Sequence, residues 1–84
     1  MQIVSYPAVF YYDKDSDSFT VAFHDLDIVT EGGTIEDAFL RAKEFLQTFM
    51  NYAKKYDEEI AKPSSFEEVK KNNKNIVFLV EAHL

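Results

Sequence analysis

Two short runs of polar side chains are the places in this chain where chemistry could be carried out. In the first run, Asp13, Asp15 and Asp17 alternate with other polar residues, as the ligands of a calcium-binding loop do. Such a loop also needs a glycine at its sixth position and a glutamate at its twelfth. Ser18 and His24 occupy these two positions. A solvated turn between two strands therefore explains the run better than a calcium site.

The second run contains His24, Asp25 and Asp27. An imidazole and two carboxylates suffice for general acid–base catalysis or for holding a divalent ion, which raises the hypothesis of a metal-dependent hydrolase. A polar turn explains the same residues, so this hypothesis is the least favoured of three. An active nuclease of the RNase H type would need several carboxylates beginning on the first strand, and residues 3–12 contain no Asp or Glu. We therefore predict a non-enzyme with no catalytic residue, no cofactor and no metal ion.

The composition indicates one globular domain spanning residues 1–84. The chain is 46% hydrophobic with eight Phe and five Tyr, and it contains no cysteine, so packing or oligomerisation must stabilise it. The first residues lack the basic and apolar segments of a secretory signal, which predicts a cytoplasmic location. The net charge of −6 repels phosphate backbones and attracts basic proteins. We expect a protein partner and no direct binding of nucleic acid or membrane.

Three strands are predicted before the first helix. Residues 2–12 are rich in β-branched and aromatic types. Pro7 among them has no N–H to donate, so its N–H side must face an edge of the sheet, a bulge or the beginning of the strand. After the acidic turn, residues 19–24 alternate at period two, which places Phe19, Val21 and Phe23 on one face. Residues 28–30 form a short third strand, and Gly32-Gly33 provides permissive backbone for the reversal into a helix.

A long amphipathic helix follows, from about Ile35 to Tyr56. Thr34 is a good N-cap with Asp37 three residues later, and apolar residues then recur at spacings of three and four. The core stripe predicted on this helix includes Phe39, Phe45, Phe49 and Met50. A second, short helix begins after Ser65, which precedes Glu68 by three positions, and it is attached to the body by Phe66 and Val69.

The last element is a continuous apolar run, residues 76–80, typical of a strand covered on both faces. We therefore place it in the middle of the sheet, parallel to the first strand, because a helical crossover between parallel strands is right-handed. The predicted fold is α+β, a four-stranded mixed sheet in the order β-β-β-α-short α-β. One long helix covers one face, so apolar surface remains on the other face for a partner or a second copy.

Several motifs in this order resemble the HicB antitoxin family. They are Tyr6-Pro7-Ala8-Val9-Phe10, Phe23-His24-Asp25-Leu26, Thr30-Glu31-Gly32-Gly33-Thr34-Ile35-Glu36-Asp37-Ala38, Ala42-Lys43-Glu44-Phe45-Leu46 and Lys62-Pro63-Ser64-Ser65-Phe66-Glu67-Glu68. The resemblance implies a partial RNase H-like fold without nuclease activity. It also implies a partner, a small basic HicA-type mRNA interferase toxin whose RNA-cleaving site the antitoxin covers. HicB antitoxins usually carry a C-terminal DNA-binding segment, which is not expected within these 84 residues.

The favoured hypothesis is an antitoxin-like protein that binds and neutralises a HicA-type toxin. Acidic loop residues would steer the toxin, and aromatic residues of the first strand would hold it. The residues expected to contact the partner are Asp13, Asp15, Asp17, Asp25, Asp27, Glu31, Tyr11 and Tyr12. A stand-alone regulatory dimer of the same fold without a toxin is the alternative, and a homo-oligomer is expected in either case.

Overall fold

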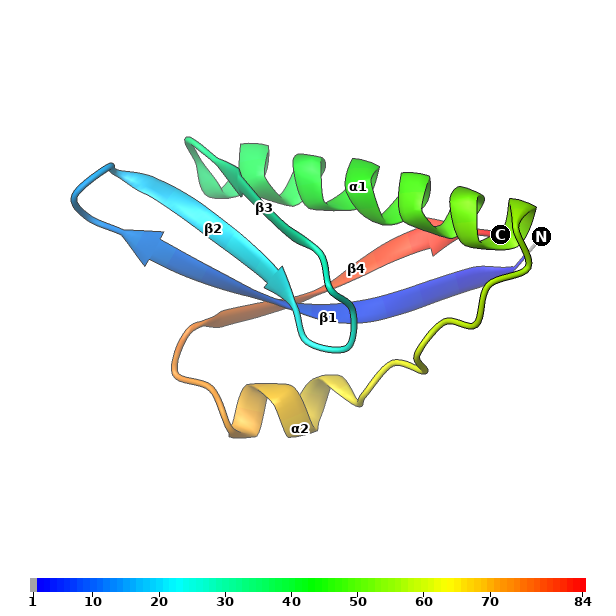
Figure 1. Ribbon diagram of the computed structural model, residues 1–84. Helices are drawn as coiled ribbons and strands as arrows, with labels where there is room; N and C mark the ends of the chain where they lie inside the picture. Colours follow the sequence, from blue (N-terminus) through cyan, green and yellow to red (C-terminus); the bar gives the residue numbers. More distant parts are fainter. Residues whose placement is uncertain (1) are drawn as a thin grey trace.

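Six elements follow one another in the computed structural model, which describes residues 2–84. They are β1 (Ile3–Asp13), β2 (Ser18–Phe23), β3 (Val29–Gly32), α1 (Ile35–Lys55), α2 (Phe66–Lys71) and β4 (Ile76–His83). The predicted order of elements is confirmed. The strands lie side by side in the order β3-β2-β1-β4, with α1 along one face of the sheet and α2 below the other (Figure 1).

The predicted mixed sheet is wrong, because every pair of neighbouring strands is antiparallel. In particular, β4 pairs with β1 from Phe10↔Ile76 to Ile3↔His83, so the two strands run in opposite directions. The prediction relied on a right-handed helical crossover into a parallel last strand. Residues 56–75 instead carry the chain back along the length of the sheet before β4 begins (Figure 1), and this additional pass reverses the direction of β4.

The last strand also lies at an edge of the sheet and not in its middle, which corrects a second prediction. Its apolar run is only half covered, since Ile76, Phe78 and Leu79 remain 41%, 40% and 45% exposed. The inner positions belong to β2 and to β1, whose Ala8, Val9 and Phe10 are buried. A continuous apolar run therefore marks β4 as a strand without fixing its place in the sheet.

The main core lies between α1 and the sheet. The helix buries a stripe of mostly small side chains, Ala38, Ala42, Leu46, Met50 and Ala53, which lets its backbone lie close to the strands. Phe39 and Phe49 pack at the margin of this core. The prediction that Phe45 belongs to the core is wrong, because its side chain is 52% exposed. Phe45 is one residue, or about 100°, around the helix from buried Leu46.

Gly32 is required by close approach and not by the backbone freedom that the sequence suggested. Neither glycine has a positive φ angle. A Cβ on Gly32 would lie 2.4 Å from the backbone nitrogen of Ala38, whereas a Cβ on Gly33 would meet nothing within 4 Å. Gly32 therefore allows the end of β3 to contact the first turn of α1.

Both helices begin at the predicted caps. The Thr34 hydroxyl accepts a hydrogen bond from the Asp37 N–H at 3.0 Å, and the Asp37 carboxylate accepts one from the Gly33 N–H at 3.2 Å. The Ser65 hydroxyl likewise accepts a hydrogen bond from the Glu68 N–H at 3.1 Å. These bonds satisfy backbone donors that the first helical turns leave unpaired.

The second face of the sheet is covered at its centre, although the sequence predicted that it would be open. Val69 of α2 is buried with Val9 and Val77 in a small separate cluster, and Pro7 is fully buried. The Pro7 carbonyl accepts a hydrogen bond from the His24 N–H at 3.1 Å, directly after β2 ends. The side of Pro7 that lacks an N–H faces the same way, beyond the end of β2, so no hydrogen bond between strands is lost there.

Candidate protein-interaction surface

The acidic turn between β1 and β2 forms its own network of hydrogen bonds. The Asp13 carboxylate accepts one from the Asp15 N–H at 3.0 Å, and the Asp17 carboxylate accepts one from the Tyr12 hydroxyl at 2.7 Å. Asp17 itself has a φ angle of 51°. The hydrogen bond to Asp17 is the main cause that raises the pKa of Tyr12 above its ordinary value. This end of the sheet is thus an ordered, exposed acidic turn.

The second polar run has a structural task. Both carboxylate oxygens of Asp25 accept hydrogen bonds from Ser64, one from its N–H at 2.8 Å and one from its hydroxyl at 2.6 Å. This contact ties the β2–β3 loop to the segment between the two helices. Within residues 2–84, no group of three or more His, Cys, Asp or Glu side chains could hold a metal ion. Within these residues His24 and Asp25 belong to no such group.

The structure divides the residues expected to contact a partner into two groups. The β1–β2 turn contains Asp13, Asp15 and Asp17, preceded on β1 by Tyr11 and Tyr12. Glu31 belongs to this group, because it pairs with Thr20 near the start of β2 and lines a hollow with Ser16 and Ser18. Asp25 and Asp27 lie at the other end of β2, in the loop to β3 (Figure 1). The eight residues therefore lie at two ends of β2 and do not form one continuous surface.

A groove between β3 and α1 is the apolar surface that the sequence did not reveal. Its volume is about 390 Å³, and its lining comprises Asp27, Ile28, Val29, Phe45, Thr48, Phe49 and Tyr52. Val29 is 65% exposed and Tyr52 56% exposed. We call this surface the β3–α1 groove. The helical pattern assigned Phe45 to the core and gave no signal for Tyr52, because only the packing of α1 shows which side of the helix is open.

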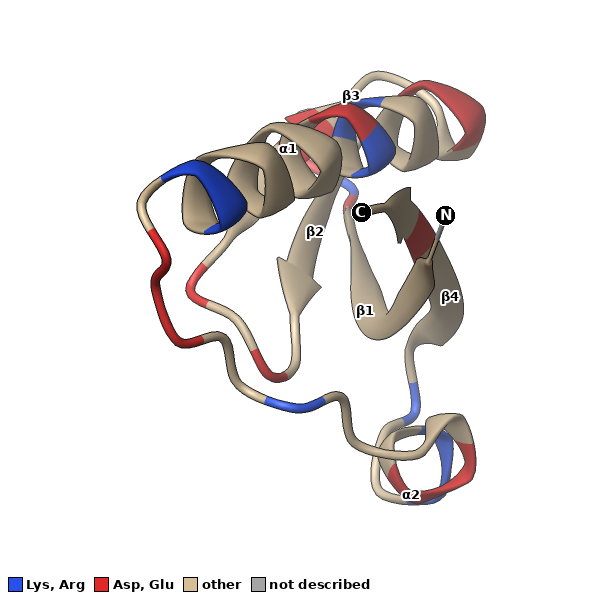
Figure 2. Ribbon diagram, turned by 90° about the vertical axis from the view of Figure 1, so that its right-hand side faces the viewer, with Lys and Arg blue, Asp and Glu red and all other residues tan. Residues whose placement is uncertain are grey.

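Acidic residues lie in and near the β3–α1 groove. Asp27 is part of its wall, and Glu31 is exposed further along β3. Tyr56 lies next to the groove residue Tyr52, with the two ring centroids 4.6 Å apart. Exposed acidic residues follow Tyr56 at positions 57–59. Figure 2 shows acidic positions of the β2–β3 loop and of the segment after α1 on the same side of the molecule. The groove thus has an apolar floor and an acidic rim, as protein interfaces often do.

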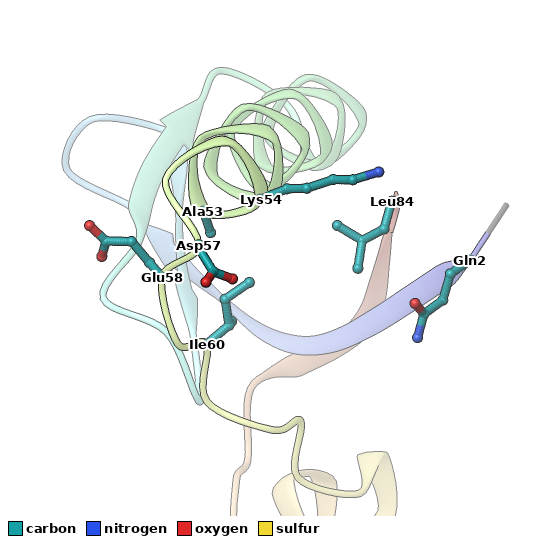
Figure 3. A pocket seen from close by; sticks show the side chains of 7 residues that line it. All are labelled: Gln2, Ala53, Lys54, Asp57, Glu58, Ile60 and Leu84. Carbon is teal, nitrogen blue, oxygen red and sulfur yellow. The ribbon is translucent and has the colours of Figure 1, made fainter.

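Another hollow lies where the two chain ends meet the end of α1. It has a volume of about 550 Å³ and is lined by Gln2, Ala53, Lys54, Asp57, Glu58, Ile60 and Leu84. Ile60 and Leu84 point into it, whereas Glu58 points away (Figure 3). Its lining contains no imidazole, thiol or hydroxyl group. Lys54 and the carboxylate of Asp57 instead make it a polar notch at the surface.

No helix within residues 2–84 has both the length and the apolar character needed to cross a membrane. The longest helix, α1, is amphipathic, and its exposed side carries several charged residues.

Solved structures of bacterial antitoxins share this fold. The N-terminal domain of Burkholderia pseudomallei antitoxin HicB has a TM-score of 0.83 and 21% identity, covering 96% of this chain and 100% of that one. A toxin–antitoxin complex from Streptococcus pneumoniae gives a TM-score of 0.80 and 22% identity, covering 98% of this chain and 70% of that one. The longer structure of B. pseudomallei antitoxin HicB has a TM-score of 0.78 and 21% identity, covering 92% of this chain and 61% of that one.

These identities are low, so the solved structures show the fold alone. No curated protein sequence matches the chain. The family model HicB-like_2, described as the HicB_like antitoxin of bacterial toxin–antitoxin systems, matches residues 5–78. This match spans most of the chain, from β1 to the start of β4, and the protein therefore belongs to the HicB-like antitoxin family.

Proposed function

We propose that this protein is the antitoxin of a toxin–antitoxin pair and that it neutralises a basic HicA-type mRNA interferase by binding it, without catalysis of its own. The observation that carries the proposal is the family match over residues 5–78. A protein with the same fold occurs in a toxin–antitoxin complex from S. pneumoniae. One of the polar residues that the hydrolase hypothesis needed, Asp25, accepts two hydrogen bonds from Ser64.

The β3–α1 groove is the surface that we assign to the toxin. Its exposed Val29, Phe45 and Tyr52 offer apolar contacts, and large side chains of this kind supply most of the binding energy at protein interfaces. Asp27 lies beside them in the wall of the groove, and Glu31 follows further along β3. Because charged residues at the rim mainly accelerate association and select the partner, this arrangement suits a basic protein.

The acidic β1–β2 turn would act at longer range. Asp13, Asp15, Asp17 and the aromatic residues Tyr11 and Tyr12 are exposed, and the net charge of −6 gives the whole molecule a negative potential. These residues steer the toxin toward the groove, whereas Asp25 contributes by holding the β2–β3 loop against Ser64.

The test is binding between this protein and the small basic protein encoded next to it. Two groove variants, Val29→Lys and Tyr52→Lys, should each weaken the affinity about tenfold or more, measured by calorimetry, because each buries a charge in an apolar contact. Phe66→Lys on α2 is the matched control, since Phe66 is also an exposed apolar residue but lies on the other face of the sheet. It should bind as the unchanged protein does.

Growth assays give the second measurement. Co-expression of this protein should restore growth to cells that express the toxin, and Val29→Lys should restore it less. If the basic neighbour neither binds nor inhibits growth, the antitoxin proposal is wrong, and the stand-alone regulatory dimer becomes the better account. If all three lysine variants bind equally, the toxin uses a different surface.

A further inference from the structure

The edge strand β4 presents backbone groups that have no partner within the domain. Pro7 directs its carbonyl to His24 on the β2 side, so Leu79, which lies opposite Pro7, directs its own N–H and C=O away from β1. By alternation the same holds for Val77, Glu81 and His83. The hydrogen bonds of His83 confirm this direction, because its N–H and C=O bind the side chain of Gln47 at 2.8 and 2.6 Å.

Gln47 closes only the C-terminal end of this edge. Its amide mimics a paired peptide group at His83, and the backbone from Val77 to Glu81 stays open. Natural edge strands are usually blocked by lysine, proline, a bulge or a covering element. Residues 76–80 contain no lysine and no proline, and their pairing with β1 is regular.

Apolar side chains flank the open edge on both faces of the sheet. Leu79 and Phe78, on opposite faces, are about half exposed. Beside them lies a hollow of about 680 Å³, lined by Ile35, Glu36, Phe39, Leu40, Phe78 and Leu79. The segment from Ile76 to Val80 carries no charged residue, although the whole chain has a net charge of −6. This uncharged segment of an acidic protein offers little to a basic partner, but two copies can meet there without repulsion between Ile76 and Val80.

We infer that β4 pairs with β4 of a second copy, antiparallel and with the two-fold axis at Leu79. In this register Leu79 faces Leu79, and Val77 faces Glu81 of the other copy. Each outward N–H and C=O between Val77 and Glu81 then finds a partner. No carboxylate faces its own copy.

The neighbouring registers are worse for physical reasons. An axis at Glu81 would set two carboxylates opposite each other, which destabilises a sheet, and would displace Gln47 from His83. An axis at Val77 would leave the groups of Glu81 unpaired. In the proposed dimer two four-stranded sheets become continuous, and β3 of each copy lies at an outer edge. Both β3–α1 grooves therefore stay accessible.

A single introduced cysteine tests the register directly, because the chain has none of its own. Leu79→Cys should form a disulfide-linked dimer under mild oxidation. Directly opposed residues in a hydrogen-bonded pair have Cα atoms about 5.5 Å apart, and a disulfide accepts that separation. The matched control is Val29→Cys, an exposed position on the opposite edge strand. Efficient linkage at position 79 and little at position 29 supports the inference, and equal linkage or none at position 79 overturns it.

Sedimentation provides the second test. The unchanged protein should sediment as a dimer, and Leu79→Lys should be a monomer with an unchanged circular dichroism spectrum, because two ammonium groups would meet at the axis. Its toxin affinity should be retained, whereas Val29→Lys should lose toxin binding and remain dimeric. A monomeric unchanged protein overturns the inference without affecting the antitoxin proposal. Loss of toxin binding by Leu79→Lys would assign the β4 edge to the toxin and would also overturn it.

Discussion

At the scale of single residues, two adjacent glycines have different tasks. Gly32 lies under α1 with Ala38 in the way of any Cβ, whereas Gly33 faces open space. Gly32→Ala should lower the free energy of unfolding by about 1–3 kcal/mol, the usual cost of overpacking. Gly33→Ala should change it by no more than about 0.5–1 kcal/mol, because its backbone is accessible to alanine. Urea denaturation of the two variants gives the comparison, and equal losses would contradict the close contact.

The hydroxyl group of Tyr6 makes a second contact that a single substitution can test. Its hydroxyl donates a hydrogen bond to the Ala61 carbonyl at 2.6 Å, and its ring is buried in the main core. Tyr6→Phe should keep the ring packing and lose that bond, which costs about 1 kcal/mol. Tyr11→Phe, on an exposed ring with no such bond, is the control and should be neutral.

The burial of Tyr6 predicts how stability depends on pH. Burial, and secondarily the charge of Asp25, raises the pKa of Tyr6 above its ordinary value of 10.0, so the folded state favours the neutral phenol. This contribution is complete below pH 10 and is lost as the pH rises through the folded pKa. The difference in unfolding free energy between the unchanged protein and Tyr6→Phe should therefore shrink above pH 10. A constant difference from pH 9 to pH 11 would show that the phenol does not titrate as described.

At the scale of elements, α2 depends on one buried side chain. Val69 alone among its six residues is buried, against Val9 and Val77. Val69→Ala should lower the unfolding free energy by about 1–2 kcal/mol and accelerate amide exchange throughout α2 while leaving α1 protected. Lys71→Ala on the exposed side of the same helix is the control. Equal exchange in α2 of both variants would mean that the helix is held by something other than Val69.

The segment between the helices is held by side chains rather than by strand pairing. Tyr6 binds it at Ala61 and Asp25 binds it at Ser64, so residues far apart in the sequence fix its path. This path sets the direction of β4, and β4 in turn leaves an open edge. An element without regular structure thus decides the topology of the sheet.

At the scale of the whole molecule, the net charge of −6 should show itself in the kinetics of toxin binding. Asp27→Asn with Glu31→Gln should slow association several-fold at low salt and leave the dissociation rate nearly unchanged, because rim charges act mainly on the encounter. The effect should fade above about 0.15 M salt, where the Debye length falls below 8 Å. Stopped-flow measurements over a salt series check this, and an effect confined to dissociation would place the two carboxylates inside the contact instead.

The sequence by itself determined the number, kind and order of the elements, because each depends on neighbours along the chain. The caps at Thr34 and Ser65 and the alternation of residues 19–24 are local signals of this type, and the motifs from Tyr6 to Glu68 led to the correct family. The tertiary structure alone decided that β4 is antiparallel and at an edge, that Phe45 is exposed, and that Asp25 binds Ser64. Each of these outcomes depends on contacts between residues distant in sequence, where many pairings satisfy the same local pattern and only the packing of the whole chain selects one.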